Sequence, residues 1–419
     1  MKSRDEIFQE ICAAGPGAGE RTCTIVFLVL TLIGIVVFLA GVSGSEAQRA
    51  WQAYLINFHF WSDVAFGTVL LSATLTMTNA RWGRSVKRLA EAPVAFLPVA
   101  FVLFWGLYFG KERLFPWIQE PVHEKAAWLN VPFLFARDGA SLFVLVAVAV
   151  ALVYASVGRD MKLLAAGSEK WGTGEAPGEG PTRLQTILAP AYGVLYAVLL
   201  SLIAFDLIMS LSPHWSSTLF GAYYWIGCFY MGLAGVIILS VIAERSMGLR
   251  GFIHDQQYHD LGKLLMGFCI VAGDFFYAQF LVIWYGNLPE ETRFVIKRTM
   301  SSPWAPVAWT VLVVCYALPF VLLLSRKIKM KRNPMLALTI MILCGMWIER
   351  FLLIVPSLWK GAQVPLGLME LCISAGFLGI MALCVLQFLK RFPLLPIADL
   401  LFQESLGIRQ VVEDEEGEG

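Results

Sequence analysis

Long, uninterrupted runs of apolar residues dominate this chain, and short polar segments separate them. Each run holds roughly 20 residues, the length that an α-helix needs to cross about 30 Å of hydrocarbon. The runs are continuously apolar rather than alternating, which favours helices over the strands of a membrane barrel. We therefore predict ten membrane-spanning helices, at residues 24–42, 55–78, 93–110, 134–157, 186–211, 217–243, 260–284, 303–325, 334–356 and 365–389.

The composition of the chain agrees with this pattern. Of its 419 residues, 58% are hydrophobic and only 15% are charged, whereas soluble proteins carry about 25% charged residues. Pattern and composition together predict an all-α polytopic membrane protein. The net charge of +1 and the lack of a basic face argue against a nucleic-acid partner.

Lysine and arginine are distributed unequally between the segments that connect these helices. Placing the N-terminus in the cytoplasm puts 22 of the 32 basic residues on the cytoplasmic side and 8 on the opposite side. The other two, Arg137 and Arg350, lie within spans. Because cytoplasmic segments of membrane proteins carry an excess of lysine and arginine, both termini are predicted to be cytoplasmic.

The predicted topology divides the chain into five segments. Residues 1–23 form a cytoplasmic N-terminal segment, 24–157 hold helices 1–4, and 186–389 hold helices 5–10. The Gly-rich segment at 158–185 predicts a flexible cytoplasmic linker that divides the two sets of helices. Residues 390–419 form a cytoplasmic tail whose acidic end, VVEDEEGEG, is predicted to be disordered. The basic turn SRKIKMKRNP is expected to contact lipid headgroups.

Nine ionisable residues lie inside the predicted spans, where a charge costs roughly 2.5–3.5 kcal/mol. Such residues usually face the interior of a helix bundle or water. In the predicted topology Asp274 lies near the middle of the membrane, and the other eight fall in its outer half. These eight residues are His59, Asp63, Arg137, Asp138, Asp206, Glu349, Arg350 and Glu370. They predict a polar layer near the periplasmic side.

Spacing and charge indicate what this outer layer does. His59 and Asp63 are four residues apart on one helical face, and an imidazole beside a carboxylate suits proton exchange near neutral pH. The alternative is a hydrogen bond that only stabilises the core. Arginines in the layer are expected to keep nearby carboxylates ionised. We expect one hydrogen-bonded group, open to the periplasmic side and composed of Asp206, His59, Asp63, Glu349 and Arg350.

A second polar pattern runs along the helix predicted at residues 260–284. Asp260, Lys263, Asp274 and Tyr277 fall within an arc of about 100° when each residue turns the helix by about 100°. This stripe would lead protons from the cytoplasmic end to the middle of the membrane. Alternatively, Asp260 is an ordinary residue of the membrane interface.

The sequence lacks the patterns that are typical of metal and haem sites. None of its eight cysteines is spaced as CxxC, which argues against iron–sulfur and zinc sites. His59 is the one histidine clearly within a span, so a second axial histidine for a b-type haem is lacking. We therefore expect this chain to bind no cofactor and to carry no redox centre.

Two longer stretches carry a resemblance to a known family. They are FDLIMSLSPHWSSTLFGAYYW, at residues 205–225, and HDLGKLLMGFCIVAGDFFYAQFLVIWYGNLPEET, at residues 259–292. Together with MELCISAGFLGI and PLLPIADLLFQESL near the C-terminus, they resemble the NrfD-like, polysulfide-reductase-type membrane subunits. Within that family the chain is most similar to the ActF-type subunit of bacterial alternative complex III. The resemblance covers helices 5–10 well and the N-terminal third weakly.

This resemblance implies a ten-helix protein of the bacterial inner membrane, with two four-helix bundles and flanking helices. The implied partners are a paralogous NrfD-like membrane subunit, an iron–sulfur subunit and c-type haem subunits, and menaquinone or another quinol reduces the complex. An ActF-type subunit is expected to contribute to assembly and to proton translocation. Asp206 matches the aspartate of the family's fifth helix, whereas Asp274 stands where the family pattern predicts an aromatic or apolar residue.

Two other functions stay open at this stage. In the first, the chain itself binds quinol on the periplasmic side, within the outer polar layer. In the second, it is a secondary transporter, a class that also buries charged residues but predicts a site near the midplane and interrupted helices in both halves. The outward position of the polar residues and the lack of a matching pair of interrupted helices argue against a transporter.

A cysteine introduced at Asn287, in the loop that contains IWYGNLPEET, tests the topology. We expect a membrane-impermeant maleimide to label Asn287→Cys from the periplasmic side, because this loop lies opposite the basic segments. The same measurement on the parent chain corrects for its own cysteines. Labelling from the cytoplasmic side alone would contradict the topology.

Overall fold

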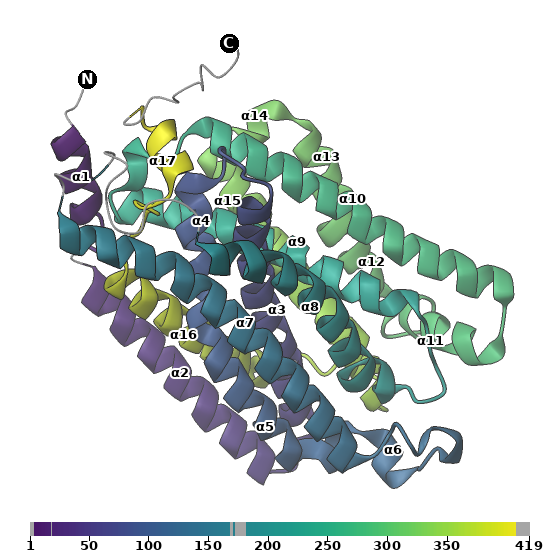
Figure 1. Cartoon of the computed structure of the whole chain (residues 1–419). Coiled ribbons are helices and arrows are strands. Elements are labelled where there is room, and N and C mark those ends of the chain that lie inside the picture. Colours follow the sequence, from purple (N-terminus) through teal and green to yellow (C-terminus); the bar gives the residue numbers. More distant parts are fainter. Residues whose placement is uncertain (1–3, 18, 168–170, 172–181, 408–419) are drawn as a thin grey trace.

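The structure, a computed structural model, describes residues 4–17, 19–167, 171 and 182–407. Among these residues the regular structure is helical and contains no strand. Ten helices are long and apolar enough to cross a membrane, which confirms the predicted all-α polytopic fold. Inner and outer denote the cytoplasmic and periplasmic sides that the basic residues predict. The terminal elements α1 and α17 lie at the same end of the molecule (Figure 1).

Seven of the described spans are continuous helices, and the span Arg183–Leu211 ends in a 3₁₀ turn at Met209–Leu211. Two other spans contain an irregular turn within them. The first such span consists of α4, a 3₁₀ turn at Ala92–Phe96 and α5, and the second consists of α12, a π-helical turn at Leu312–Ala317 and α13. The helices are α1 Arg4–Ala13, α2 Glu20–Ser43, α3 Ala47–Met77, α4 Arg84–Glu91, α5 Leu97–Leu114, α6 Pro116–Gln119, α7 Val131–Ala166, α8 Arg183–Leu207, α9 Leu219–Ser246, α10 Asp255–Gly286, α11 Pro289–Thr299, α12 Ala305–Val311, α13 Leu318–Leu324, α14 Arg326–Lys329, α15 Arg332–Leu358, α16 Leu368–Arg391 and α17 Leu400–Ser405.

The ten spans form two four-helix bundles and a flanking pair. In the first bundle, α3, α5, α7 and α8 form a ring in which each helix contacts its neighbours, and α9, α10, α12–α13 and α15 form a similar ring in the second. The bundles meet where α3 and α8 pack against α9. The pair α2 and α16 packs beside α3 at one edge, and α10 lies at the opposite edge (Figure 1).

The boundary between the bundles does not fall at the predicted linker, residues 158–185. The helices on its two sides, α7 and α8, belong to the same bundle. Both ends of the segment are helical, because α7 continues to Ala166 and α8 begins at Arg183. Trp171 is buried, and residues 168–170 and 172–181, which hold most of the predicted flexible stretch, lie outside the described residues. The bundles are instead divided at the turn between α8 and α9.

Glycines allow the closest helix contacts. A Cβ atom on Gly67 of α3 would lie 2.1 Å from the Cys228 carbonyl oxygen of α9, and a Cβ atom on Gly232 would lie 2.3 Å from the Gly67 carbonyl carbon. Small residues at a crossing let two helix backbones approach, which is a common way to pack helices in membranes. Gly34 and Gly376 serve the same purpose between α2 and α16. The two central helices, α3 and α9, are thereby buried along most of their length.

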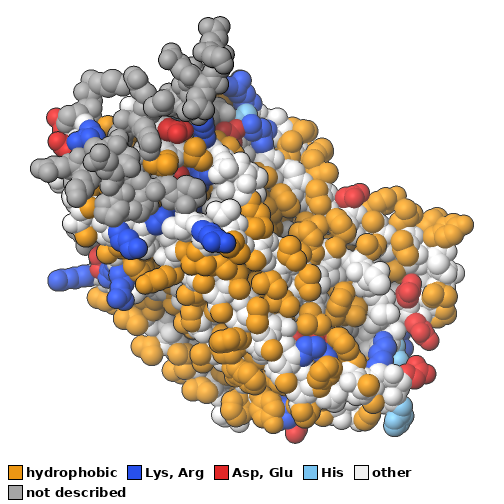
Figure 2. Space-filling view, viewed as in Figure 1, with side chains coloured by type: hydrophobic (Ala, Val, Ile, Leu, Met, Phe, Trp, Pro, Cys, Tyr) orange, Lys and Arg blue, Asp and Glu red, His pale blue; other side chains and the backbone are white. Residues whose placement is uncertain are grey.

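The outside of the molecule is apolar across its middle. Large hydrophobic side chains are exposed on α2, α5, α7, α8, α10, α13 and α16, as expected for helices that face lipid. In Figure 2 hydrophobic side chains cover the central part of the visible face, and most of the charged side chains gather toward its two ends. The surface therefore agrees with a protein that crosses the membrane several times.

A buried ionic network holds the C-terminal segment at the inner end of the first bundle. Asp399, just before α17, accepts hydrogen bonds from Arg84 of α4 at 2.8 Å and from Lys87 at 3.4 Å. The indole nitrogen of Trp171 donates to the Ile397 carbonyl oxygen at 2.9 Å. Residues 392–407 of the predicted tail are therefore packed against the helices, and its acidic end lies outside the described residues.

The same network includes residues that the sequence places in an inner loop. All of α4, Arg84–Glu91, is buried, although residues 79–92 are predicted to connect two spans at the membrane surface. Arg88 pairs with both Glu91 and Asp160 of α7, and Asp160 also accepts a hydrogen bond from the Ala398 amide at 2.9 Å. The charges tolerate burial because each has a partner of opposite sign.

Asp399 gives a test of this network. Burial raises the pKa of the Asp399 carboxyl, but Lys87 and Arg84 outweigh burial and hold that pKa below its ordinary value. We expect Asp399→Asn to lower the free energy of unfolding by roughly 3 kcal/mol, because two buried cations lose their partner. Stabilisation by a carboxyl with a depressed pKa is complete above the ordinary pKa of about 4 and is lost below it. The difference in free energy of unfolding between the parent protein and Asp399→Asn should therefore be the same at every pH between about 5 and 8.

Thermal unfolding of the detergent-solubilised protein across this pH range measures the loss. Glu404→Gln is the control, because Glu404 lies 3.5 Å from Arg81, whose side chain is 65% exposed. Removing such a surface pair should change the free energy of unfolding by less than about 1 kcal/mol. Equal losses in the two variants, or a loss that varies between pH 5 and 8, would contradict the network's role.

Candidate functional site

A tyrosine joins two of the predicted residues, His59 and Asp63. Both side chains face α9 from one side of α3, and the Tyr224 hydroxyl of α9 lies between them. This oxygen is 2.6 Å from His59 Nδ1 and 2.8 Å from each oxygen of Asp63. All three side chains are buried. The spacing of four residues thus brings an imidazole and a carboxyl group to one shared hydroxyl.

Arg350 of α15 lies at the centre of the group. Its Nε donates a hydrogen bond to Asp63 at 3.0 Å, and its Nη1 donates to the neighbouring Glu349. The guanidinium also lies over the ring of Tyr224, with 4.4 Å between Cζ and the ring centroid. Arg350 is completely buried. One positive charge therefore connects a carboxyl group of the first bundle with one of the second.

Glu349 extends the group into the second bundle. It accepts a hydrogen bond from the Tyr223 hydroxyl of α9, and that hydroxyl lies 3.3 Å from the Tyr316 hydroxyl. We name the connected set the Arg350 cluster, which consists of His59, Asp63, Tyr223, Tyr224, Tyr316, Glu349 and Arg350. Hydrogen bonds run through it from α3 to the π-helical turn between α12 and α13.

The helix that carries Tyr316 is irregular at this point. Leu312–Ala317 form the π-helical turn, and Pro319 lacks the N–H group that would bond to the Cys315 carbonyl in a regular helix. The Tyr230 hydroxyl of α9 donates to this free carbonyl at 3.0 Å. A side chain of α9 thereby supports the irregular turn, which stands beside the Arg350 cluster.

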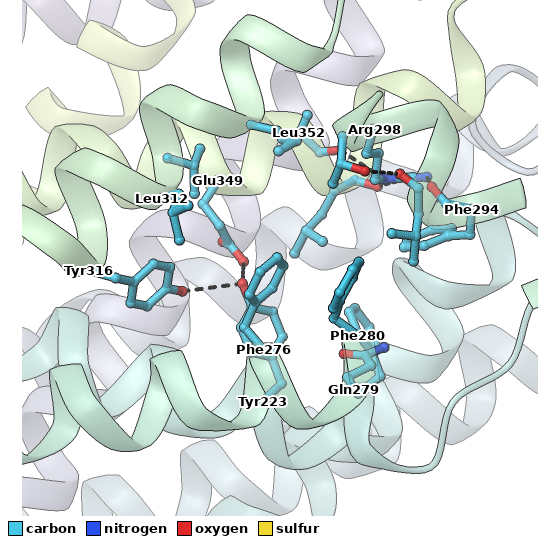
Figure 3. A pocket seen from close by; sticks show the side chains of 16 residues that line it. Tyr223, Phe276, Gln279, Phe280, Phe294, Arg298, Leu312, Tyr316, Glu349 and Leu352 are labelled. Atoms are coloured by element: carbon cyan, nitrogen blue, oxygen red, sulfur yellow. Dashed lines mark hydrogen bonds between the residues drawn. The ribbon is translucent and has the colours of Figure 1, made fainter. Parts of the chain in front are cut away.

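A cavity lies next to Glu349 within the second bundle. Its volume of about 90 Å³ is several times the roughly 10–15 Å³ that one water needs. Figure 3 shows Tyr223, Tyr316 and Glu349 together on one side of it and Arg298 and Phe294 on the other. Most other lining residues are apolar or aromatic, among them Phe220, Phe276, Phe280, Val311, Leu312 and Leu352. The cluster thus has one face toward a space with few polar groups.

Helix α11 contributes Arg298 to the wall of this cavity. Arg298 donates hydrogen bonds to the Leu352 carbonyl at 3.1 Å, the Leu353 carbonyl at 2.8 Å and the Ser357 hydroxyl at 2.7 Å. The Leu352 carbonyl is available because Pro356, four residues later, has no N–H group. Burial lowers the pKa of Arg298 to about 9, which leaves this side chain protonated at neutral pH.

A wider depression of about 580 Å³ lies on the outer side of Arg298. It shares Phe294 and Arg298 with the cavity. These two side chains are stacked, with 3.5 Å between the guanidinium carbon and the ring centroid. The depression is polar, and its lining includes Arg113, Glu120, His214, Glu290, Arg293 and Lys360. The stacked pair therefore lines both the cavity beside the cluster and the charged outer depression.

Asp206 belongs to a separate group in the first bundle. It accepts hydrogen bonds from Arg137 Nε at 2.7 Å and from Trp128 Nε1 at 2.8 Å. Asp138 is fully buried beside it and interacts with its carboxyl group. No hydrogen bond among the described residues connects Asp206 with Arg350. The prediction of one group is therefore wrong for Asp206, because α8 places this residue against α7 instead of α15.

Glu370 and Asp260 are also held by local partners. Both oxygens of Glu370 accept hydrogen bonds from Arg49, at 2.9 and 3.0 Å, which ties α16 to α3. Asp260 pairs with Lys263 at 2.6 Å, one turn further along α10. Neither pair contacts the Arg350 cluster.

Asp274 lies on the exposed side of α10. Tyr277, one turn away, is exposed as well. The stripe predicted as an inner proton route therefore faces away from the second bundle. The inner proton route along α10 stays a prediction. The structure places Asp274 and Tyr277 on the exposed side of the helix, because the period of a helix fixes which residues share a face but not where that face points.

Several residues of the site were not predicted. Tyr223 and Tyr224 occur as an adjacent pair in an apolar span, and Tyr316 lies in another. Because a buried tyrosine hydroxyl usually has a hydrogen-bond partner, these residues could have been predicted to join a polar group inside the bundle. Arg298 gave no such signal, because it belongs to a loop that carries several charged residues. Its importance follows from the folding of α11 over the cavity.

Comparisons with known proteins leave the geometry of the site as the main guide to function. No family model matches the chain, and no curated protein matches it. Among the described residues, no group of three or more His, Cys, Asp or Glu side chains is arranged to hold a metal ion. The Arg350 cluster is a buried set of ionisable and hydroxyl-bearing side chains that are joined by hydrogen bonds.

Arg350 gives a test of how the cluster is held together. We expect Arg350→Gln to lower the free energy of unfolding by roughly 3–5 kcal/mol, because Asp63 and Glu349 remain buried without a cation. Lys263→Gln is the control, since Lys263 is 53% exposed and its loss should cost less than about 1 kcal/mol. Thermal unfolding in detergent compares the two variants. Equal small losses would show that Arg350 is not required for the packing.

Proposed function

We propose that this chain is a membrane subunit of a quinol-oxidising complex of the alternative complex III type. In this proposal the Arg350 cluster moves protons toward the outer side of the membrane. The observation that carries the proposal is that two buried carboxyl groups share one buried arginine, beside a cavity that adjoins a charged outer depression. This arrangement provides a site at which one proton is held away from water.

Charge balance explains why the cluster suits a proton carrier. With Asp63 and Glu349 both ionised and His59 neutral, two negative charges face the single positive charge of Arg350. One added proton makes the cluster neutral. Because net charge inside the membrane is costly, binding of this proton is favoured, and its release leaves only one net charge. The proton resides on a carboxyl group, since arginine stays charged.

The hydrogen bonds give this proton a direction. Glu349 contacts the Tyr223 hydroxyl, and Tyr223 and Tyr316 both line the cavity. The cavity has room for several waters, which would carry the proton to the stacked pair of Phe294 and Arg298. Beyond that pair lies the charged depression of the outer surface.

The resemblance of the sequence supports the assignment to a complex. It implies that a paralogous NrfD-like subunit, an iron–sulfur subunit and c-type haem subunits share the bacterial inner membrane complex with this chain. Menaquinone or another quinol is oxidised in the complex, and the redox centres belong to the partner chains. The function of this chain is then assembly and proton translocation.

Quinol binding in the cavity is the second candidate function. The observation in its favour is the lining, which is mostly aromatic and aliphatic with a few polar groups, as in many ligand sites. Tyr223 stands where it would accept a hydrogen bond from a quinol hydroxyl, and Glu349 stands where it would take the proton. In that case Glu349 takes protons directly from the substrate.

Purification of the complex through an affinity tag on this chain tests the assignment. We expect iron–sulfur and c-type haem subunits to co-purify, and we expect Glu349→Gln and Asp63→Asn to leave the assembled complex and its quinol oxidation intact. Both variants should lower the ratio of protons released to electrons transferred, because an amide cannot exchange the proton. Assembly, oxidation rate and this ratio are measured on one preparation in lipid vesicles.

Two further variants separate the alternatives. Glu370→Gln is the matched control, because Glu370 is a buried carboxyl group outside the cluster, and its variant should keep the ratio. Phe280→Trp narrows the cavity, so it should raise the KM for quinol if quinol binds there. Asp206→Asn reports on the separate group in the first bundle. An unchanged ratio in both Glu349→Gln and Asp63→Asn would refute the proton route.

A further inference from the structure

The exposed face of α10 carries a carboxyl group in the middle of the membrane. Asp274 lies 12 residues before the outer end of α10, about 18 Å at 1.5 Å per residue, and so near the centre of this helix. Its side chain is exposed, and among the described residues it forms no hydrogen bond or ion pair. A carboxyl group at this depth is costly when it faces lipid.

The rest of this face is apolar and aromatic. The residues on the same side of α10, one to three turns from Asp274, are all exposed, namely Ile270, Tyr277, Leu281 and Tyr285. The other side of the helix packs against α9 and α13, and Gln279 and Phe280 line the cavity. Lys263, three turns nearer the inner end of the same face, pairs with Asp260. Asp274 is thus the one carboxyl group without a partner among the described residues in a stripe that has the period of a helix-packing surface.

Other sources of a cation for Asp274 do not fit. Lipid headgroups lie at the membrane surface, far from the centre of α10. A second copy of this chain does not supply one either, because the two arginines away from the ends of the predicted spans are already paired. Arg137 binds Asp206, and Arg350 binds Asp63 and Glu349. A cation at this depth must therefore come from a different polypeptide.

We infer that this face of α10 docks against a membrane-spanning helix of another protein, and that this helix places an arginine or lysine beside Asp274. Pairing would cancel the two charges in the low-dielectric interior, where each alone is unfavourable. Tyr277 and Leu281 would pack against the same helix. The inference rests on exposure and charge, so it holds whether or not the Arg350 cluster carries protons.

A photo-reactive amino acid at Tyr277 tests this surface in native membranes. We expect illumination to give one cross-linked protein, whose cross-linked segment is a membrane span with an arginine or lysine within about one helical turn. When Asp274→Leu is combined with the photo-reactive residue at position 277, the yield of the cross-linked product should fall at least about tenfold, because the substitution leaves the partner's cation unpaired. Reversal of both charges, with Asp274→Lys and an aspartate in place of the partner's cation, should restore the yield.

The design distinguishes a lost interface from a misfolded chain. Leucine is more apolar than aspartate, so Asp274→Leu should insert at least as well as the parent, and its amount in the membrane is measured alongside. A probe at Tyr154, an exposed residue of α7, gives the reference yield, and Asp274→Leu should not change it. Cross-linking to lipid alone, to a second copy, or to a span without a cation would overturn the inference. An undiminished yield with Asp274→Leu would overturn it as well.

Discussion

The shared ion pair of Arg350 is the interaction on which both the packing and the proposed chemistry depend. Arg350 binds Asp63 of the first bundle and Glu349 of the second, and its guanidinium covers Tyr224 of α9. Either carboxylate alone would be costly in the membrane interior, and so would the arginine. Because two carboxyl groups share one cation, the set is neutral only with one added proton. In the proposed function, the charge that joins the bundles is therefore also the reason that a proton is bound there.

Helix α3 makes this arrangement feasible. It is the least apolar of the ten spans, yet most of it is buried, so protein surrounds its polar side chains. Gly67 lets it approach α9 closely enough for His59 and Asp63 to reach the hydroxyl of Tyr224. At its inner end, Ser72 donates to Glu91 of the buried ionic network at 2.9 Å. The polar groups at the middle of α3 and near its inner end thus fix how this helix packs against its neighbours.

Helix α10 links the cavity to the surface of the molecule. One side of it contributes Phe276, Gln279 and Phe280 to the cavity, and the other exposes Asp274. A helix that docked on the exposed side would press on the wall of the cavity beside Glu349. If the proposed partner binds there, α10 would connect partner binding with the environment of the Arg350 cluster.

The sequence by itself determined the membrane class and the ten spans, because hydrophobic runs of fixed length reflect local physical costs. It also identified His59, Asp63, Glu349 and Arg350 as members of one group. The tertiary structure alone decided that Asp206 is paired elsewhere and that Asp274 points outward. It also revealed that α4 is buried and that residues 392–407 pack against the helices, since the packing of segments distant in sequence settles which face of each is buried. Helical periodicity shows which residues lie together on a helix, but only the neighbouring helices decide what that face meets.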